Sequence, residues 1–209
     1  STVTNAVTAT ISVGLSPYGT AMSPDGTRLY VANWGNNSVS VINTITNSVT
    51  ASISVGAYPE GLAVSNDGSR VYVANNNSNN VSVINTATNA VIATVTVGTN
   101  PMGVSVSADG SKAFIANYSS NTVSVLNTGT NLIGATIAVG NGPVAFGNFT
   151  GGAICPGPAK TFAILVNPTP NVTQPSNHVV CNGKTTSLVN LTGSVTGTTF
   201  DWVNSNTSI

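Results

Sequence analysis

An internal repeat of 42 residues constrains the fold of this chain more than any other feature of its sequence. A Ser-x-Asp-Gly tetrapeptide places Asp25, Asp67 and Asp109 at this interval. A second tetrapeptide, an aromatic and a β-branched residue followed by Ala-Asn, recurs with the same spacing at residues 30–33, 72–75 and 114–117. Because no insertion breaks the period between residues 3 and 149, this segment consists of copies of one supersecondary unit.

Each period predicts four short strands. Val, Ile and Thr alternate with polar residues, and the 3.6-residue spacing of an amphipathic helix is absent. Asn66-Asp67-Gly68 indicates a tight hairpin between the first two strands, since these residue types tolerate positive φ. Four antiparallel strands in about 40–45 residues are typical of one β-propeller blade. In the second period the strands are expected at residues 61–65, 70–75, 80–85 and 90–97.

The repeat resembles the YVTN family of β-propeller repeats. Tyr-Val-Ala-Asn at 30–33, Ser-Val-Ser-Val-Ile-Asn-Thr at 38–44, the Val-Gly-x-x-Pro turn and the Ser-x-Asp-Gly hairpin carry the resemblance. Ala stands third in the tetrad, where the family has Thr. The resemblance extends over residues 3–149. It implies a non-enzymatic, all-β protein of the cell surface that serves adhesion or surface-layer assembly.

The number of repeats predicts an incomplete ring. We expect one outer strand at 3–13, then three full periods, then the first strand of a further blade at 144–149. A propeller ring has about four to eight blades. We therefore interpret residues 1–150 as a partial propeller from a longer protein, with ring completion by a second copy as the alternative. Uncovered strand edges would favour self-association in either case.

The composition changes after Gly152, where the period stops. Residues 151–166 are expected to form a linker and a strand, and residues 167–209 a partial module. The segment around Trp202 resembles the PKD-like, immunoglobulin-like repeats of adhesive surface proteins, which implies a partial β-sandwich with this tryptophan in its core. Cys155 and Cys181 would form a disulfide in a secreted protein, and two unpaired thiols are the alternative.

The charge balance excludes several classes of partner. Charged residues make up 5% of the chain, and five Lys and Arg balance five Asp and Glu. Nucleic-acid binding through phosphates needs many basic side chains, so we expect no nucleic-acid partner. The zero net charge argues in the same way against anionic membrane surfaces. The sequence also lacks the roughly 20-residue apolar segment of a membrane helix, and we expect no membrane insertion.

Groups suited to catalysis are few. The single histidine, His178, lies outside the repeat, and no Cys/His cluster with zinc-ligand spacing occurs. Asp25, Asp67 and Asp109 occupy the same hairpin in successive blades, so each is expected to pair with the basic residue three positions later, such as Arg28. We therefore predict no catalytic residue, no cofactor and no metal site.

Residues that differ between blades are the candidates for ligand contact. Tyr18, Glu60 and Met102 share one position of the repeat, and Trp34 and Tyr118 share another. Propeller topology is expected to place both positions on one face, where aromatic planes suit sugars or peptides. Surface glycans or other surface proteins are the expected partners of an extracellular protein. The alternatives are aromatics that only cap the face, a purely structural spacer, and a propeller enzyme of lactonase or lyase type.

Overall fold

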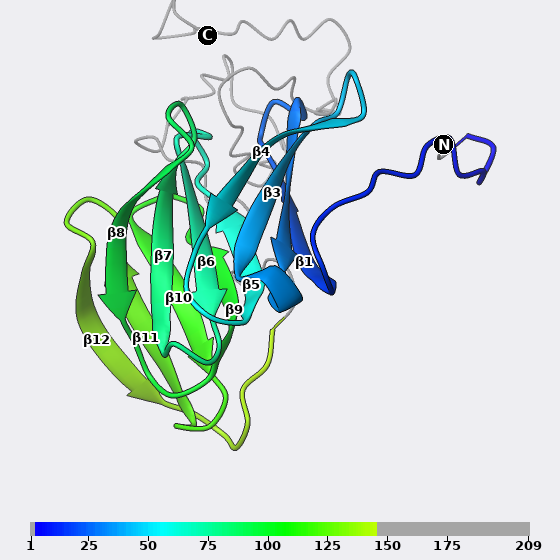
Figure 1. Cartoon of the computed structure of the whole chain (residues 1–209). Coiled ribbons are helices and arrows are strands. Elements are labelled where there is room, and N and C mark those ends of the chain that lie inside the picture. Colours follow the sequence, from blue (N-terminus) through cyan, green and yellow to red (C-terminus); the bar gives the residue numbers. More distant parts are fainter. Residues whose placement is uncertain (1–2, 146–209) are drawn as a thin grey trace, which may run out of the picture. The chain divides into compact units, whose positions relative to one another are not determined.

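The structure, a computed structural model, describes residues 3–145, which form three four-stranded antiparallel sheets (Figure 1). Within each sheet the strands lie in chain order, and each sheet is one 42-residue period. The first sheet contains β1 (Pro17–Met22), β2 (Arg28–Asn33), β3 (Ser38–Asn43) and β4 (Ser48–Ser54). The second contains β5 (Pro59–Val64), β6 (Arg70–Asn75), β7 (Asn80–Asn85) and β8 (Ala90–Thr96). The third contains β9 (Pro101–Val106), β10 (Lys112–Asn117), β11 (Thr122–Asn127) and β12 (Leu132–Ala138).

The predicted all-β, partial propeller is confirmed. The strands expected at 70–75 and 80–85 form with those bounds. The first and fourth strands of the second period have bounds that differ from the expected ones by one or two residues. Each sheet is one blade, with β1, β5 or β9 as its inner strand. A single 3₁₀ turn, η1 (Trp34–Asn36), is the only helical element in the described part of the chain. No helix there is long and apolar enough to cross a membrane.

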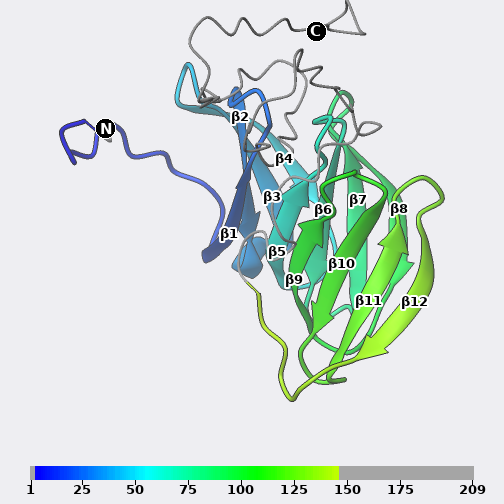
Figure 2. The ribbon, with the colours of Figure 1, turned by 180° about the vertical axis from the view of Figure 1, so that it is seen from behind.

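The hydrophobic core lies between neighbouring sheets, whose side-by-side arrangement is seen in Figure 2. Between the first two sheets, Tyr30 and Val41 pack against Leu62 and Val73. Between the second and third, Tyr72 and Val83 belong to the equivalent cluster, with Ile115 from the third sheet. The two tyrosines are 0% exposed, so they are interior side chains of the junctions. The second sheet contributes side chains to both clusters, with one cluster on each of its faces, so it is stabilised mainly by the blades beside it.

The inner strands approach one another at glycines that recur with the period. A Cβ atom placed on Gly19 would lie 2.2 Å from the carbonyl oxygen of Glu60 in the next blade. The same construction on Gly61 gives 2.4 Å to the carbonyl oxygen of Met102, and on Gly103 it gives 2.0 Å to that of Ala145. Side-chain carbon atoms do not occur at such distances from backbone oxygen. Glycine is therefore required here because neighbouring backbones lie in contact.

Two strands expected at the limits of the repeat differ in the structure. The strand expected at 3–13 does not form: residues 3–5 lie in a turn and residues 6–13 have no regular secondary structure. At the other limit, residues 144–145 form no strand, but Ala145 lies beside Gly103 where the next inner strand is expected. The expectations for 146–149, for the linker at 151–166 and for the module at 167–209 lie outside the described residues. The same holds for Cys155, Cys181, His178 and Trp202.

The glycine contact predicts an asymmetric effect of two Gly→Ala substitutions. Gly61→Ala should lower the free energy of unfolding by about 1–3 kcal/mol, because its methyl group would meet the backbone of β9. Gly134→Ala on the outer strand β12 is the matched control, since its nearest neighbour would be 3.9 Å away. Urea denaturation of the two variants measures the difference. Equal stability of the two variants would contradict the inferred contact.

Candidate functional site

The two ends of the blades carry different loops. At one end, here called the loop face, each inner strand begins and the second strand of the blade passes into the third. At the other end, the hairpin face, short turns join the first strand to the second and the third to the fourth. The pairing of Pro17 with Asn33 places the start of β1 beside the end of β2, and Pro59 pairs with Asn75 in the same way. The five candidate residues therefore all lie at the loop face.

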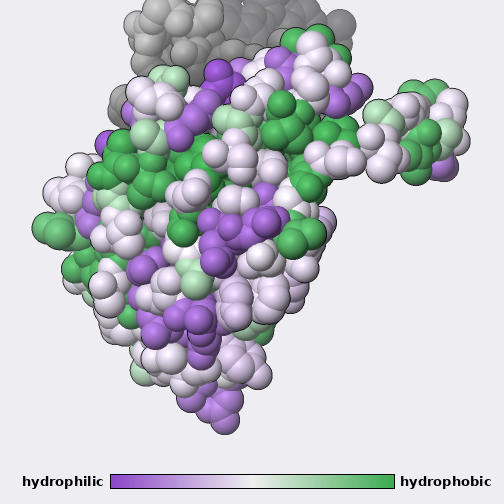
Figure 3. Space-filling model, viewed as in Figure 1, coloured by the Kyte–Doolittle hydropathy of each residue, from purple (hydrophilic) through white to green (hydrophobic). Residues whose placement is uncertain are grey.

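Their environments at the loop face differ. Tyr18 and Tyr118 are 53% and 47% exposed, whereas Trp34 and Met102 are half-buried. Glu60 is 6% exposed, although it occupies the same repeat position as Tyr18. In the view of Figure 3, exposed apolar residues lie over the outer strands toward the opposite, hairpin end. Of the five candidates, Tyr18 and Tyr118 are thus the ones that present a large surface to a ligand.

Trp34 stacks on an aromatic residue that the repeat comparison had not singled out. Its ring lies 4.1 Å from that of Tyr58, with the two planes inclined by 18°. Tyr58 precedes β5, so the pair spans the junction between the first and second blades. At the next junction, one period later, the equivalent residues are Asn76 and Asn100, and the Asn100 amide donates to Asn76 Oδ1 at 3.0 Å.

The segment that follows the third blade, counted here as a third junction, holds yet another pair at the same two positions, Tyr118 and Gly142. A Cβ on Gly142 would lie 3.0 Å from the ring of Tyr118, so the ring lies directly over the glycine. The three junctions therefore hold a stacked aromatic pair, an amide pair and a tyrosine over a glycine. The side chains at these positions vary together, which accounts for part of the variation between blades by packing rather than by ligand contact.

A hydrogen bond from a backbone N–H group to an asparagine side chain is common to the three junctions and sets this geometry. The side chains of Asn37, Asn79 and Asn121 accept from the backbone N–H groups of Tyr58, Asn100 and Gly142 at 2.9–3.0 Å. Tyr58 has a φ of 56°, and Asn100 has a φ of 51°. A left-handed backbone costs about 1–2 kcal/mol for a bulky residue. The stack with Trp34, worth about 0.5–1.5 kcal/mol, offsets much of that cost.

The pairing predicts that two substitutions compensate one another. Trp34→Asn and Tyr58→Asn should each lower the free energy of unfolding, because each leaves one member of the stack alone. The double variant should lose less than the sum, by about 0.5–1.5 kcal/mol, because it recreates the pair seen at Asn76 and Asn100. Thermal unfolding measures the coupling. Trp34→Asn combined with Tyr118→Asn is the control for independent junctions and should be additive, and additivity in the first pair would contradict the interpretation.

Glu60 is an unusual group on the inner strand β5. Its Oε2 atom is buried and has no hydrogen-bond partner. Burial raises the pKa of this carboxyl above its usual range, since the charged form loses its hydration. Sequence comparison identified Glu60 as a variable residue, but its burial depends on close packing between blades that composition does not reveal.

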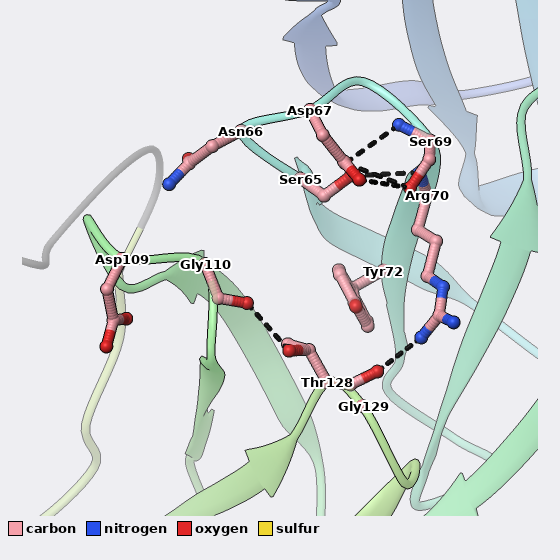
Figure 4. A pocket seen from close by; sticks show the side chains of 10 residues that line it. All are labelled: Ser65, Asn66, Asp67, Ser69, Arg70, Tyr72, Asp109, Gly110, Thr128 and Gly129. Carbon is pink, nitrogen blue, oxygen red and sulfur yellow. Dashed lines mark hydrogen bonds between the residues drawn. The ribbon is translucent and has the colours of Figure 1, made fainter. Parts of the chain in front are cut away.

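The carboxylates of the hairpin face have the opposite environment. Asp67 Oδ1 accepts hydrogen bonds from Ser65 Oγ at 2.5 Å and from the Ser69 N–H at 3.0 Å (Figure 4). These bonds lower the pKa of Asp67 to about 2, and the pKa values of Asp25 and Asp109 are lowered to about 2 in the same way. The three carboxylates therefore stay ionised near neutral pH and stabilise their own turns.

The expected pairing of each hairpin aspartate with the following basic residue is wrong for the first two blades. Arg28 Nη1 donates to the carbonyl oxygen of Thr86 in the second blade at 2.6 Å. Arg70 donates in the same way to the carbonyl oxygen of Thr128 in the third blade. The turn serines and threonines already satisfy the aspartates, so the arginines are available to join blades. Spacing within one repeat gave no signal for a bond between repeats.

A cavity of about 310 Å³ lies beside Arg70 on the hairpin face (Figure 4). Asp67, Tyr72, Asp109 and Gly129 are among its lining residues. Within residues 3–145, no group of three or more His, Cys, Asp or Glu side chains is placed to hold a metal ion. The carboxylates here are engaged by turn hydrogen bonds, so this cavity offers little unused chemistry.

Two substitutions should change the pH dependence of stability in opposite directions. The lowered pKa of Asp67 stabilises the fold above about pH 4, and this contribution is lost as the pH falls toward 2. The raised pKa of Glu60 favours the fold at low pH, and this contribution is lost as the pH rises above 4.5. Asp67→Asn should therefore lower the free energy of unfolding, relative to the unsubstituted chain, at pH 7 but little at pH 2. Glu60→Gln should have a more stabilising effect on the free energy of unfolding at pH 7 than at pH 4. Urea titrations at the three pH values test both signs, and the same pH dependence in the two variants would contradict the assignment.

Comparison with known proteins supports the fold. A family model described as "Lactonase, 7-bladed beta-propeller" matches residues 16–90. Among solved structures, hydrazine synthase from Kuenenia stuttgartiensis is similar, with 31% identity and a TM-score of 0.60 over 66% of this chain and 41% of that one. A functionally unknown protein from Desulfotomaculum acetoxidans DSM 771 has 20% identity and a TM-score of 0.56, over 61% of this chain and 44% of that one.

More distant structures agree on the architecture alone. The protein U3-55K has 14% identity and a TM-score of 0.58, over 63% of this chain and 42% of that one. A search of curated proteins found no match. The chain thus spans 41–44% of the length of these three solved structures. Together with the three sheets, the matches show a β-propeller repeat protein.

Proposed function

We propose that the chain is part of a non-catalytic β-propeller that recognises glycans or proteins through its loop face. The resemblance of the repeat to surface-protein propellers supports an extracellular location and a role in adhesion or surface-layer assembly. A neutral chain with 5% charged residues is suited to ligands that are recognised by stacking and neutral hydrogen bonds.

The observation that carries the proposal is the exposure of aromatic rings at one end of the blades. Tyr18, Tyr58 and Tyr118 are 53%, 38% and 47% exposed, and all belong to loop-face positions that differ between blades. Each combines a flat apolar surface with a hydroxyl group, which suits the faces of sugar rings and peptide groups. The Asn76–Asn100 pair adds amide donors and acceptors at the same end.

A lactonase-type enzyme is the second candidate, and the family-model match over 16–90 favours it. Glu60 lies within this matched segment and is a buried carboxyl with a raised pKa, which is the environment of many general acids. The three hairpin aspartates, with pKa values of about 2, are poor proton donors near neutral pH. One acid without a described partner supports catalysis less strongly than the aromatic face supports binding.

Binding of the full chain to glycan and peptide arrays tests the proposal. Tyr18→Ala combined with Tyr118→Ala should weaken any specific binding about 10–100-fold, which corresponds to about 1.4–2.8 kcal/mol from the two aromatic residues together. Val49→Ala combined with Ile92→Ala is the matched control, since these side chains are 41% and 48% exposed on outer strands. It should leave affinity unchanged.

Trp34→Ala is a less direct probe of binding. Because Trp34 stacks on Tyr58, the substitution would also lower the free energy of unfolding. Equal loss of binding in the tyrosine and control variants would contradict recognition by the loop face. Turnover of lactones that is abolished by Glu60→Gln, with binding absent, would favour the enzyme.

A further inference from the structure

The cavity on the hairpin face lies between two side chains that join the second and third blades. On one side of it, the Asn66 amide donates to the carbonyl oxygens of Ser107 and Ala108 at 3.0 and 2.7 Å. On the other side, Arg70 donates to the carbonyl oxygen of Thr128. Because these bonds cross the junction, they fix the walls of the cavity. Its volume of about 310 Å³ lies at the lower end of the range for small-molecule sites, about 300–1,000 Å³.

The carboxylates of this cavity are engaged by their turns, but one polar group in its wall is not. Tyr72 lines the cavity and is 0% exposed, and its hydroxyl has no hydrogen-bond partner among the described residues. In Figure 4 its ring stands between Arg70 and Gly110. Burial raises the pKa of the Tyr72 phenol, so the hydroxyl keeps its proton and is a donor near neutral pH. A buried donor without an acceptor is unfavourable, and a ligand that accepts this bond would remove the cost.

The charges around the cavity disfavour an ionic ligand. Asp67 and Asp109 have pKa values of about 2, so an anion would meet two like charges in the wall. The guanidinium of Arg70 in the same wall opposes a cation. Asp109 accepts three hydrogen bonds from its own turn, out of about four that a carboxylate can accept. One further donor can therefore be satisfied there, and a hydroxyl group can both donate and accept.

We propose that this cavity binds a small neutral molecule with several hydroxyl groups, about the size of a single sugar ring or a cyclic polyol. One ligand hydroxyl accepts from Tyr72, and the guanidinium of Arg70 supplies N–H donors beyond the one that Thr128 receives. A ligand hydroxyl also donates to Asp109. The site lies at the opposite end of the blades from the loop face, so this inference does not depend on the proposed function.

The first junction has the same buried tyrosine in a less suitable setting. Tyr30 is also 0% exposed, and its hydroxyl has no hydrogen-bond partner among the described residues. In sequence, however, Pro24 and Ala87 stand there in the places of Asn66 and Gly129. The proline has no amide group, and the alanine adds a methyl group where glycine leaves space. The two junctions therefore form a matched pair, in which the second has the more open and more polar cavity.

Titration of the full chain with myo-inositol and with a panel of D-hexoses, followed by saturation-transfer NMR, tests the site. At least one of these probes should bind saturably, and Tyr72→Phe should weaken its binding about 3–10-fold, because one hydrogen bond is lost. Tyr30→Phe is the matched control, since it removes the same kind of buried hydroxyl at the other junction, and it should leave the affinity unchanged. Phe114 occupies the equivalent position of the third blade, so the fold accommodates phenylalanine here.

Gly129→Ala is a second variant, and it leaves the tyrosine in place. A Cβ atom on Gly129 would meet only Asn127 Oδ1, at 3.4 Å, so the chain should fold with an unchanged melting temperature. The methyl group reproduces Ala87 of the first junction and should weaken binding of the same probe. Unchanged affinity in both Gly129→Ala and Tyr72→Phe would overturn the proposal.

Four further results would also overturn it. The first is that no probe binds saturably, which would leave the cavity to water. The second is an equal loss of affinity in Tyr72→Phe and Tyr30→Phe. The third is tighter binding of inorganic phosphate than of any hydroxylated probe. The fourth is binding that Tyr18→Ala combined with Tyr118→Ala abolishes and Tyr72→Phe does not change, because the probe would then occupy the loop face.

Discussion

Contact between the backbones of neighbouring inner strands is the constraint on which the rest of the structure depends. Gly19, Gly61 and Gly103 remove the side chain at the points of closest approach, and this brings the apolar faces of adjacent sheets together. The buried tyrosines of β2 and β6 then fill the space between sheets. The arginine bonds at the hairpin face and the asparagine bonds at the loop face connect the two ends of the first two junctions. A blade in this fold is therefore defined by its neighbours as much as by its own strands.

The loop face shows why variation between repeats is ambiguous evidence for a binding site. Trp34 and Tyr118 differ from Asn76 at the equivalent position, and a comparison of single positions attributes such differences to ligand contact. The structure shows that each of these residues has a matched partner across a junction. Tyr18 is 53% exposed, so it presents more of its ring to solvent than the half-buried Trp34 does. The sequence already showed this pairing, because the residues equivalent to Tyr58 change together with those equivalent to Trp34.

The sequence predicted local structure well and contacts between blades poorly. The hairpin at Asp67 follows from residues that are adjacent in the chain, and strands 70–75 and 80–85 follow from alternation within a few residues. The bond from Arg28 to the carbonyl of Thr86 joins residues 58 positions apart and involves a backbone atom, which every residue type provides. The burial of Glu60 likewise depends on how closely two strands pack. Alternation and turn residues carry no information about either.

The three different junction pairs also affect how the chain finds its fold. Blades with nearly the same sequence compete for the same neighbours during folding, and wrong association between similar units is a common failure of repeat proteins. The backbone contacts at the glycines are alike at every junction, so they cannot distinguish one order of blades from another. A tryptophan that stacks on Tyr58 finds no such ring at Asn100 or Gly142, and the amide of Asn76 gains nothing from an aromatic face. Each junction pair thus favours contact between one blade and the blade that follows it in the sequence. A chain in which all three pairs were made identical would be more symmetric, but it would no longer distinguish correct from incorrect blade neighbours.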